Sequence, residues 1–253
     1  MSDHRVRLLP ARGRSLTGVA VTVAAAGLLG VTAVAGVTGC SSINSSSSEN
    51  TTSMTTRIGA FSASQLRAAL LTRVNGAGPA AKPEAGSYGS IPAIQAAQKQ
   101  LGGMRVTPKL CMRASVLQAI ILDTGALGSA PAAIVAFKVG TNGVSELLAA
   151  TADSATAASL SQPIPASCAR YTVYSQGKAY HLSVQQAWVK GIGIQRARVL
   201  GIKTAGVKGS LWSLLYQGTG FVGTVTIDGL NSNEAAVREI ATQAYDYAAK
   251  ILP

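Results

Sequence analysis

Downstream of residue 39 the chain has a single histidine, so base catalysis would have to centre on His181. A Ser-His-Asp triad needs an imidazole that takes the serine proton and a carboxylate that orients it. His181 alternates with Ser183 on one side of an extended segment and lies opposite Leu182 and Val184, which predicts the polar face of a strand. A surface histidine is the simpler interpretation. One histidine and two cysteines that we expect to be oxidised supply no ligand set for a metal.

Asp123 is the second candidate for chemistry, because it begins an Asp-Thr-Gly-Ala run after two apolar residues. This pattern is typical of the active-site loop of retroviral-type aspartic proteases, in which two carboxylates share one proton and activate water. The chain has one Asp-Thr-Gly, so catalysis would require a symmetric dimer. Residues 114–122 have a helical pattern, and a glycine just after a helix is a common C-cap. We therefore expect a helix end here, and keep a hydrolase using Asp123 or His181 as the remote alternative.

Two further motifs match known patterns but fall in predicted turns. Residues 218–223 match GxGxxG, yet they lie between two expected strands, whereas a dinucleotide site needs a strand followed by a helix. Residues 175–178 match the SxxK of penicillin-binding enzymes, but Gly177 and the flanking strands indicate a turn. The sequence thus predicts no catalytic residue and no cofactor.

The N-terminal segment has the three parts of a secretory signal: an arginine-rich head, an uncharged run over residues 16–37, and a small-residue exit. The exit, Val37-Thr38-Gly39-Cys40, resembles the lipobox of bacterial lipoproteins. That resemblance implies cleavage after residue 39, acylation of Cys40 (diacylglycerol, with palmitate as a typical acyl chain), and location on the extracytoplasmic face of the cell membrane. The alternative is an uncleaved anchor helix, because ~20 apolar residues suffice to span a bilayer.

Cysteine usage agrees with export. If Cys40 carries lipid, Cys111 and Cys168 remain, and in an oxidising compartment we expect them to form a disulfide bond. Closing the loop between Cys111 and Cys168 would stabilise the fold by roughly 4 kcal/mol in the chain-entropy model.

The charge of the mature chain limits its partners. Residues 1–39 contain four arginines and one aspartate, so their removal leaves 18 basic against nine acidic residues. Outside the membrane the acidic partners are lipid headgroups and phosphate-bearing envelope polymers, and nucleic acid is not expected. The basic residues form no dense run.

Beyond the leader, the composition divides the chain in two. Residues 40–57 are rich in Ser, Thr and Asn and predict a flexible tether that would hold the domain some 20–25 Å from the lipid. Residues 58–253 are long enough for one domain. Helical spacing is present over 60–74, 91–101, 114–122 and 153–160, with a Gly/Pro-rich loop over 75–88.

After Ala130 the hydrophobic period changes to two, which predicts strands. These are expected at 132–139, 143–149, 171–175, 180–189, 194–202, 211–217 and 221–227. Asn231, with Glu234 three residues on, predicts the cap of a last helix. The apolar stripe of that helix is Val237, Ile240, Ala241, Ala244, Ala248 and Ile251. The predicted class is α+β: an antiparallel sheet of about five to seven strands flanked by helices, with the long C-terminal helix packed on it.

Five segments in this order carry a resemblance: 106–111, 144–148, 168–173, 211–216 and 221–226. Together they resemble the actinobacterial lipoproteins related to the extracellular sensor domain of mycobacterial serine/threonine receptor kinases, over residues 60–252. The resemblance implies a cleft for an unknown ligand and no catalysis. Those sensor domains typically have two disulfides, whereas only one can form here. No kinase is attached, so a signal would pass to a separate membrane protein.

The late aromatic residues allow two interpretations. Trp188, Trp212 and Tyr216 could be core residues under the last helix, or they could line an apolar pocket with Arg196 and Arg198 at its mouth. The expected function is a non-catalytic sensor or ligand-binding domain for a small molecule, a lipid or an envelope polymer. The alternative is a carrier of a lipid or glycolipid, which needs a large apolar cavity.

Overall fold

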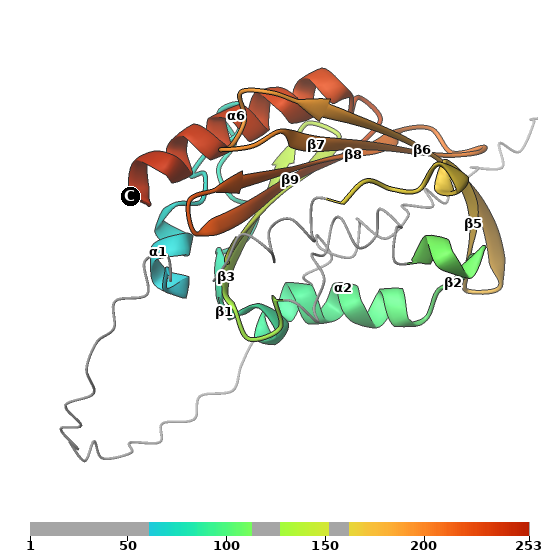
Figure 1. The fold of residues 1–253 in the computed structure, drawn as a ribbon, viewed down its shortest axis with the longest axis horizontal. Helices are drawn as coiled ribbons and strands as arrows, with labels where there is room; N and C mark the ends of the chain where they lie inside the picture. The colour runs from blue at the N-terminus through green and yellow to red at the C-terminus, as the bar shows by residue number, and fades with distance from the viewer. Residues whose placement is uncertain (1–60, 113–126, 152–161, 253) are drawn as a thin grey trace, which may run out of the picture.

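The computed structural model describes residues 61–112, 127–151 and 162–252. One nine-stranded antiparallel sheet runs through the molecule in the order β1-β3-β4-β9-β8-β7-β6-β5-β2 (Figure 1). The strands are β1 (Glu84–Ser87), β2 (Arg105–Thr107), β3 (Pro131–Val139), β4 (Asn142–Ala150), β5 (Arg170–Ser175), β6 (Lys178–Val189), β7 (Ala197–Thr204), β8 (Ser210–Gly218) and β9 (Phe221–Gly229).

The α+β class is confirmed, but the predicted five to seven strands are too few. Six of the seven long strands lie within two residues of their predicted bounds, and β7, predicted at 194–202, begins three residues later. The two missed strands, β1 and β2, have four and three residues and form the two edges of the sheet. Such short edge strands have too few positions to display an alternating pattern. The segments 175–178 and 218–220 form hairpin turns, as expected, and Gln176 and Gly177 have positive φ.

Three α-helices accompany the sheet in the described part of the chain: α1 (Ala63–Ala68), α2 (Pro92–Gly102) and α6 (Glu234–Ile251). The proline at the start of α2 was predicted. The first helix is shorter than the predicted 60–74, because the chain turns after Ala69 and forms a bridge between Val74 and Ala77. The predicted helices 114–122 and 153–160 lie outside the described residues.

The predicted ends of the last helix were wrong by a few residues. Its cap is Asn233, whose side chain accepts the N–H of Ala236, and Asn231 instead lies in the turn after β9. At the other end Ile251 is 40 % exposed and Leu252 is buried, because the helix stops there and the extended next residue points back to the core. The rest of the predicted stripe is buried.

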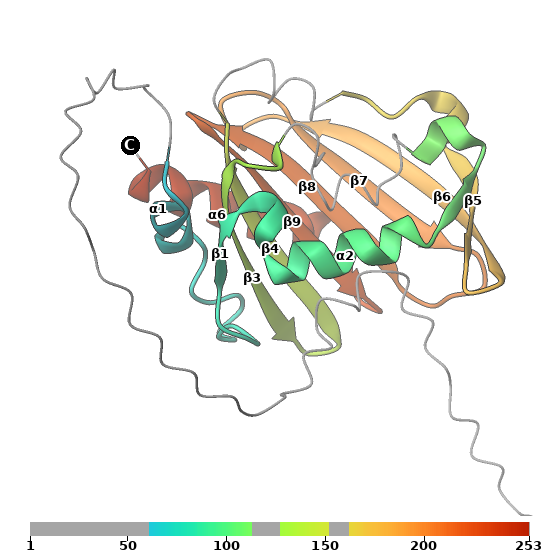
Figure 2. The same cartoon turned by 90° about the horizontal axis from the view of Figure 1, so that it is seen from below.

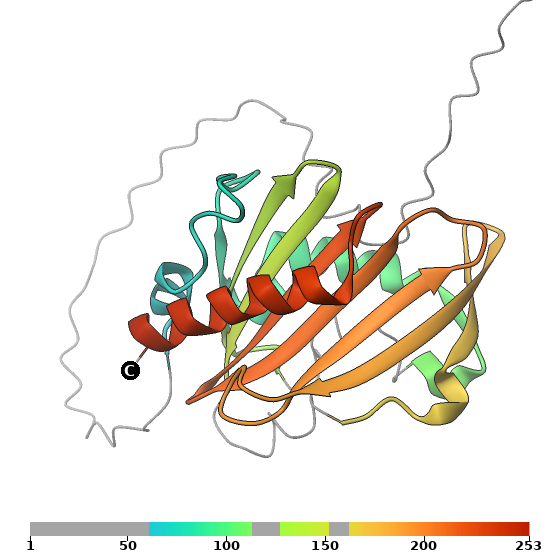
Figure 3. The ribbon, with the colours of Figure 1, turned by 90° about the horizontal axis from the view of Figure 1, so that it is seen from above.

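The helices cover opposite faces of the sheet. α6 crosses β8 and β9 on one face, here called the α6 face, and α2 lies on the other (Figures 2 and 3). The largest core lies on the α6 face and joins α1, α6 and the central strands. Two smaller cores lie on the opposite face, one under α2 and one around Cys111 and Cys168.

The cover of the α6 face is incomplete. α6 leaves β5 and most of β6 uncovered on this face (Figure 3). Gly201 of β7 marks the border, because a Cβ there would lie 2.7 Å from the indole of Trp212, the last large core residue on this side. Beyond it the outward residues are polar, including His181, Ser183 and Gln185, and they are exposed.

Candidate functional site

A pocket of about 520 Å³ opens on the uncovered part of the α6 face, over β2, β5, β6 and β7. Three basic side chains line it: Arg170, His181 and Lys203. Three hydroxyl-bearing residues of the same sheet face accompany them: Thr107, Thr172 and Ser183. No aspartate or glutamate is among its described lining residues. The set is suited to an anion.

Strand register explains why these distant residues meet. Arg170 pairs with Ser183, and Ser183 with Lys203, so one row crosses β5, β6 and β7. Two positions along, Thr107 pairs with Thr172, and Thr172 with His181. Residues paired across antiparallel strands and residues two apart share a face, so both rows point to the same side.

Short contacts hold the pocket floor in place. The Nδ1 atom of His181 lies 3.1 Å from the hydroxyl of Thr172, within hydrogen-bond distance. In the adjacent row Arg105 stacks over the ring of Tyr174 at 4.2 Å, which adds a fourth basic side chain near the rim. The partner given to His181 is a hydroxyl, whereas a triad base is oriented by a carboxylate. The arrangement can bind and orient an anion.

Comparison with known proteins identifies the fold. No protein-family model matches the chain, and no curated protein does. Among solved structures, the extracellular domain of PknH from Mycobacterium tuberculosis has a TM-score of 0.53 at 14 % identity, covering 75 % of this chain and 97 % of that one. The two chains share a fold. An uncharacterised Rv0999 orthologue from Mycobacterium smegmatis follows with a TM-score of 0.37 and 16 % identity, over 58 % of this chain and 77 % of that one.

The resemblance to mycobacterial sensor domains is therefore confirmed in fold. None of the helices in the described part of the chain is long and apolar enough to cross a membrane. The same part of the chain also has no cluster of three His, Cys, Asp or Glu side chains that could hold a metal ion. Cys40, the lipobox residues Val37, Thr38 and Gly39, and Asp123 lie outside the described residues.

The PknH-like fold does not bring together the five residues proposed as an aromatic pocket. Trp212 and Tyr216 are buried in the core of the α6 face. Trp188 lies on the opposite face, 36 % exposed, with the guanidinium of Arg196 5.3 Å from its ring. Arg198 pairs with Trp188 across β6 and β7 but is buried and donates to the carbonyl of Gln162. Burial lowers the pKa of Arg198 to about 10.

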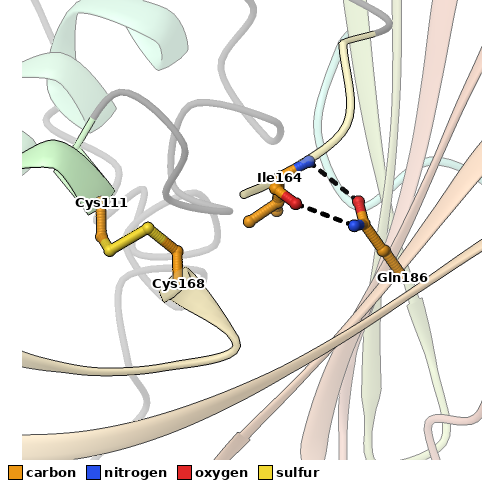
Figure 4. The surroundings of a disulfide bond; sticks show 4 residues. All are labelled: Cys111, Ile164, Cys168 and Gln186. Atoms are coloured by element: carbon orange, nitrogen blue, oxygen red, sulfur yellow. Dashed lines mark hydrogen bonds between the residues drawn. A yellow bond between two sulfur atoms is a disulfide. The ribbon is translucent and has the colours of Figure 1, made fainter. Parts of the chain in front are cut away.

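A disulfide joins Cys111 and Cys168 (Figure 4). It joins two short 3-10 helices, Lys109–Met112 after β2 and Ala166–Cys168 before β5. Nearby, the amide of Gln186 accepts from the N–H of Ile164 and donates to its carbonyl, both at 2.9 Å. These links fix the strands that supply Thr107 and Arg170.

Sequence reasoning missed the most perturbed carboxyl, which lies in the core. Glu146 accepts the N–H of Leu71 at 2.7 Å, and burial raises its pKa to about 8. Burial, with the charge of Glu146, also raises the pKa of Tyr216. A signal was present: position 146 has the same parity as the inward-facing Val144 and Leu148. This carboxyl links the segment after α1 to the sheet.

Proposed function

We propose that this protein is a lipid-anchored, extracytoplasmic, non-catalytic sensor domain that binds an anionic ligand in the pocket of Arg170, His181 and Lys203. The observation that carries the proposal is the grouping of three basic side chains with the hydroxyls of Thr107, Thr172 and Ser183 on one open sheet face, with no acid among the described lining residues. The whole stretch from residue 154 to residue 227 contains seven Lys or Arg and no Asp or Glu. Such an imbalance favours a positive potential over strands β5 to β9.

The chemistry of the side chains defines the ligand class. The planar guanidinium of Arg170 can donate two parallel hydrogen bonds to a phosphate, sulfate or carboxylate, and Lys203 adds a compact charge. The hydroxyls of Thr107, Thr172 and Ser183 can donate to further oxygens. Because the cations are exposed, binding should weaken with salt. A phosphate-bearing envelope polymer or an acidic lipid headgroup fits this site.

Location and signalling complete the proposal. The lipobox favours acyl groups on Cys40, and the fold shared with an extracellular domain favours an extracytoplasmic location. Residues 40–57 would then be the tether and residues 58–253 the domain. The bound state would be passed to a separate membrane protein. An open cationic pocket favours a sensor over a carrier that encloses an acyl chain.

Titration of the purified full chain with inorganic phosphate, a glycerol-phosphate oligomer and a neutral glycan tests the ligand class. We expect a heat of binding or chemical-shift changes with inorganic phosphate and the glycerol-phosphate oligomer, and none with the neutral glycan. The double variant R170Q/K203Q should bind both phosphates about tenfold more weakly, because each exposed charge contributes up to about 1 kcal/mol.

The matched control for charge is K178Q/K208Q, which removes two exposed lysines outside the pocket lining. Equal weakening in both double variants would refute a specific pocket, and equal binding of the neutral glycan would refute an anion site. Intact-mass analysis of the membrane fraction tests the anchor separately. The expected species begins at an acylated Cys40, and a chain that retains residues 1–39 without lipid would contradict it.

A further inference from the structure

The turn that joins β6 to β7 presents an apolar side chain outward from a fixed backbone. Ile194 is 54 % exposed, yet its N–H donates to the carbonyl of Gln217 at 2.8 Å. Ile192 beside it is buried in the main core. Gly193 has φ +87°, and a Cβ there would lie 2.6 Å from the carbonyl oxygen of Gln217, so only glycine fits. The exposure of Ile194 is therefore imposed by the packing of the turn.

Basic residues flank this apolar tip. Lys190 and Arg196 are exposed on either side of the turn, and Arg196 stacks on the exposed ring of Trp188. No acidic residue lies in the same stretch of sequence, residues 154–227. Tryptophan and a β-branched apolar residue ringed by Lys and Arg match the interface between acyl chains and acidic headgroups.

The tip lies at the end of the sheet where the chain enters the domain. Gln217, which holds the turn, is followed by the β8–β9 hairpin, and Phe221 at its far side packs against Phe61 with ring centroids 6.2 Å apart. Phe61 is the first residue that the structure describes. Figure 3 shows the β6–β7 turn and the β8–β9 turn at the same end of the sheet. A chain anchored upstream of Phe61 would bring this end toward the bilayer.

We propose that the tip formed by Trp188, Lys190, Ile194 and Arg196 docks onto an acidic phospholipid surface. Ile194 and the Trp188 ring enter the headgroup region, while Lys190 and Arg196 contact lipid phosphates. Trp188 lies five residues along β6 from Ser183 of the anion pocket, roughly 15–17 Å at the rise of a strand. Docking therefore leaves the pocket off the membrane and accessible to its ligand.

Tryptophan quenching tests this proposal directly. The chain has two tryptophans, and Trp212 is buried, so Trp188 is the exposed reporter. The full chain is reconstituted into vesicles with bromine on the acyl chains, of either phosphatidylglycerol or phosphatidylcholine. Quenching should occur in the first and be several-fold weaker in the second. The docked-to-undocked ratio should fall about fivefold for each basic residue neutralised in K190Q and R196Q, and I194S should lower it too.

Matched controls exist at the other end of the sheet. Leu230, in the turn after β9, is 59 % exposed, so L230S removes an apolar side chain of equal exposure to Ile194. K178Q/K208Q removes two lysines at the β5–β6 and β7–β8 connections, at the end of the sheet away from the tip. Both controls should leave quenching unchanged. Equal quenching in the two lipids, or equal loss in I194S and L230S, would overturn the proposal. Protection of the tip in native membranes but not in pure lipid would identify a protein as the occupant instead, and would also overturn it.

Discussion

The two halves of the α6 face use the same strand geometry for different purposes. In the covered half, the residues of β4, β8 and β9 on this face are buried and, apart from Glu146, mostly apolar, among them Leu148, Leu214 and Phe221. On β5, β6 and the end of β7, the equivalent positions are mostly polar and exposed, among them Arg170 and Lys203. The two halves differ because α6 covers one of them and leaves the other uncovered (Figure 3). Stability and ligand binding should therefore be separable by mutation.

The largest expected effect is in the covered half. Phe221 is fully buried and packs edge-on against Phe61 and Tyr216. Phe221→Ala should lower the free energy of unfolding by about 3–5 kcal/mol, from lost apolar burial and the cavity left behind. Denaturant unfolding followed by circular dichroism measures this. A loss below about 1 kcal/mol would show that the covered half is not the stabilising one.

The disulfide should matter mainly to the uncovered half. Replacing both Cys111 and Cys168 with alanine should cost about 2–5 kcal/mol. Because the bond ties the ends of β2 and β5, amide hydrogen exchange should increase there more than in β9. Uniform acceleration across all strands would indicate that the bond supports the whole fold equally.

Glu146 sets the pH dependence of the covered half. Its folded pKa, about 8, lies above the ordinary 4.5, so the folded state binds more protons between these values. Stability is full below pH 4.5 and falls by about 1.4 kcal/mol per pH unit until the carboxyl ionises near pH 8. Glu146→Gln keeps an acceptor for the N–H of Leu71 and should flatten this decline. The measurement is unfolding free energy at pH 5 and pH 8, and an unchanged slope in the variant would exclude Glu146 as its source.

The smallest expected effect on stability is in the uncovered half. His181 is exposed, so His181→Ala should change the unfolding free energy by about 0.5 kcal/mol or less. The affinity of this variant for phosphate should nevertheless fall several-fold, because a positioned donor is lost from the pocket. Paired unfolding and titration experiments on the same variant distinguish the two. A large loss of stability would place His181 in the supporting structure instead.

The long elements could be predicted from sequence because their periodicity reports their own burial. The seven long strands and the stripe of Val237, Ile240 and Ala241 are visible without any knowledge of partners. β1 and β2 were missed because they depend on pairing with β3 and β5. The helix cap moved from Asn231 to Asn233 because the length of β9 sets where the turn ends, and a capping pattern does not contain that information.

Predicting the site requires the pairing register between strands, which a single sequence does not contain. Trp188 and Trp212 were grouped as aromatic residues of neighbouring strands. The pairings Trp188–Arg198 and Arg198–Leu215 put Trp188 on the opposite face from Trp212 and Tyr216. His181 was correctly expected on a polar face, but its neighbours Thr107, Arg170 and Lys203 come from three other strands. The missing acids between residues 154 and 227 were the available clue.

Amide chemical shifts during titration of the isotope-labelled full chain with a glycerol-phosphate oligomer test the central claim most directly. Shifts should concentrate at Thr107, at residues 170–172 and 181–183, and at 203–205, and R170Q/K203Q should abolish them. Shifts centred on the covered strands β8 and β9, or shifts that persist in R170Q/K203Q, would contradict the claim that the uncovered half binds the anion.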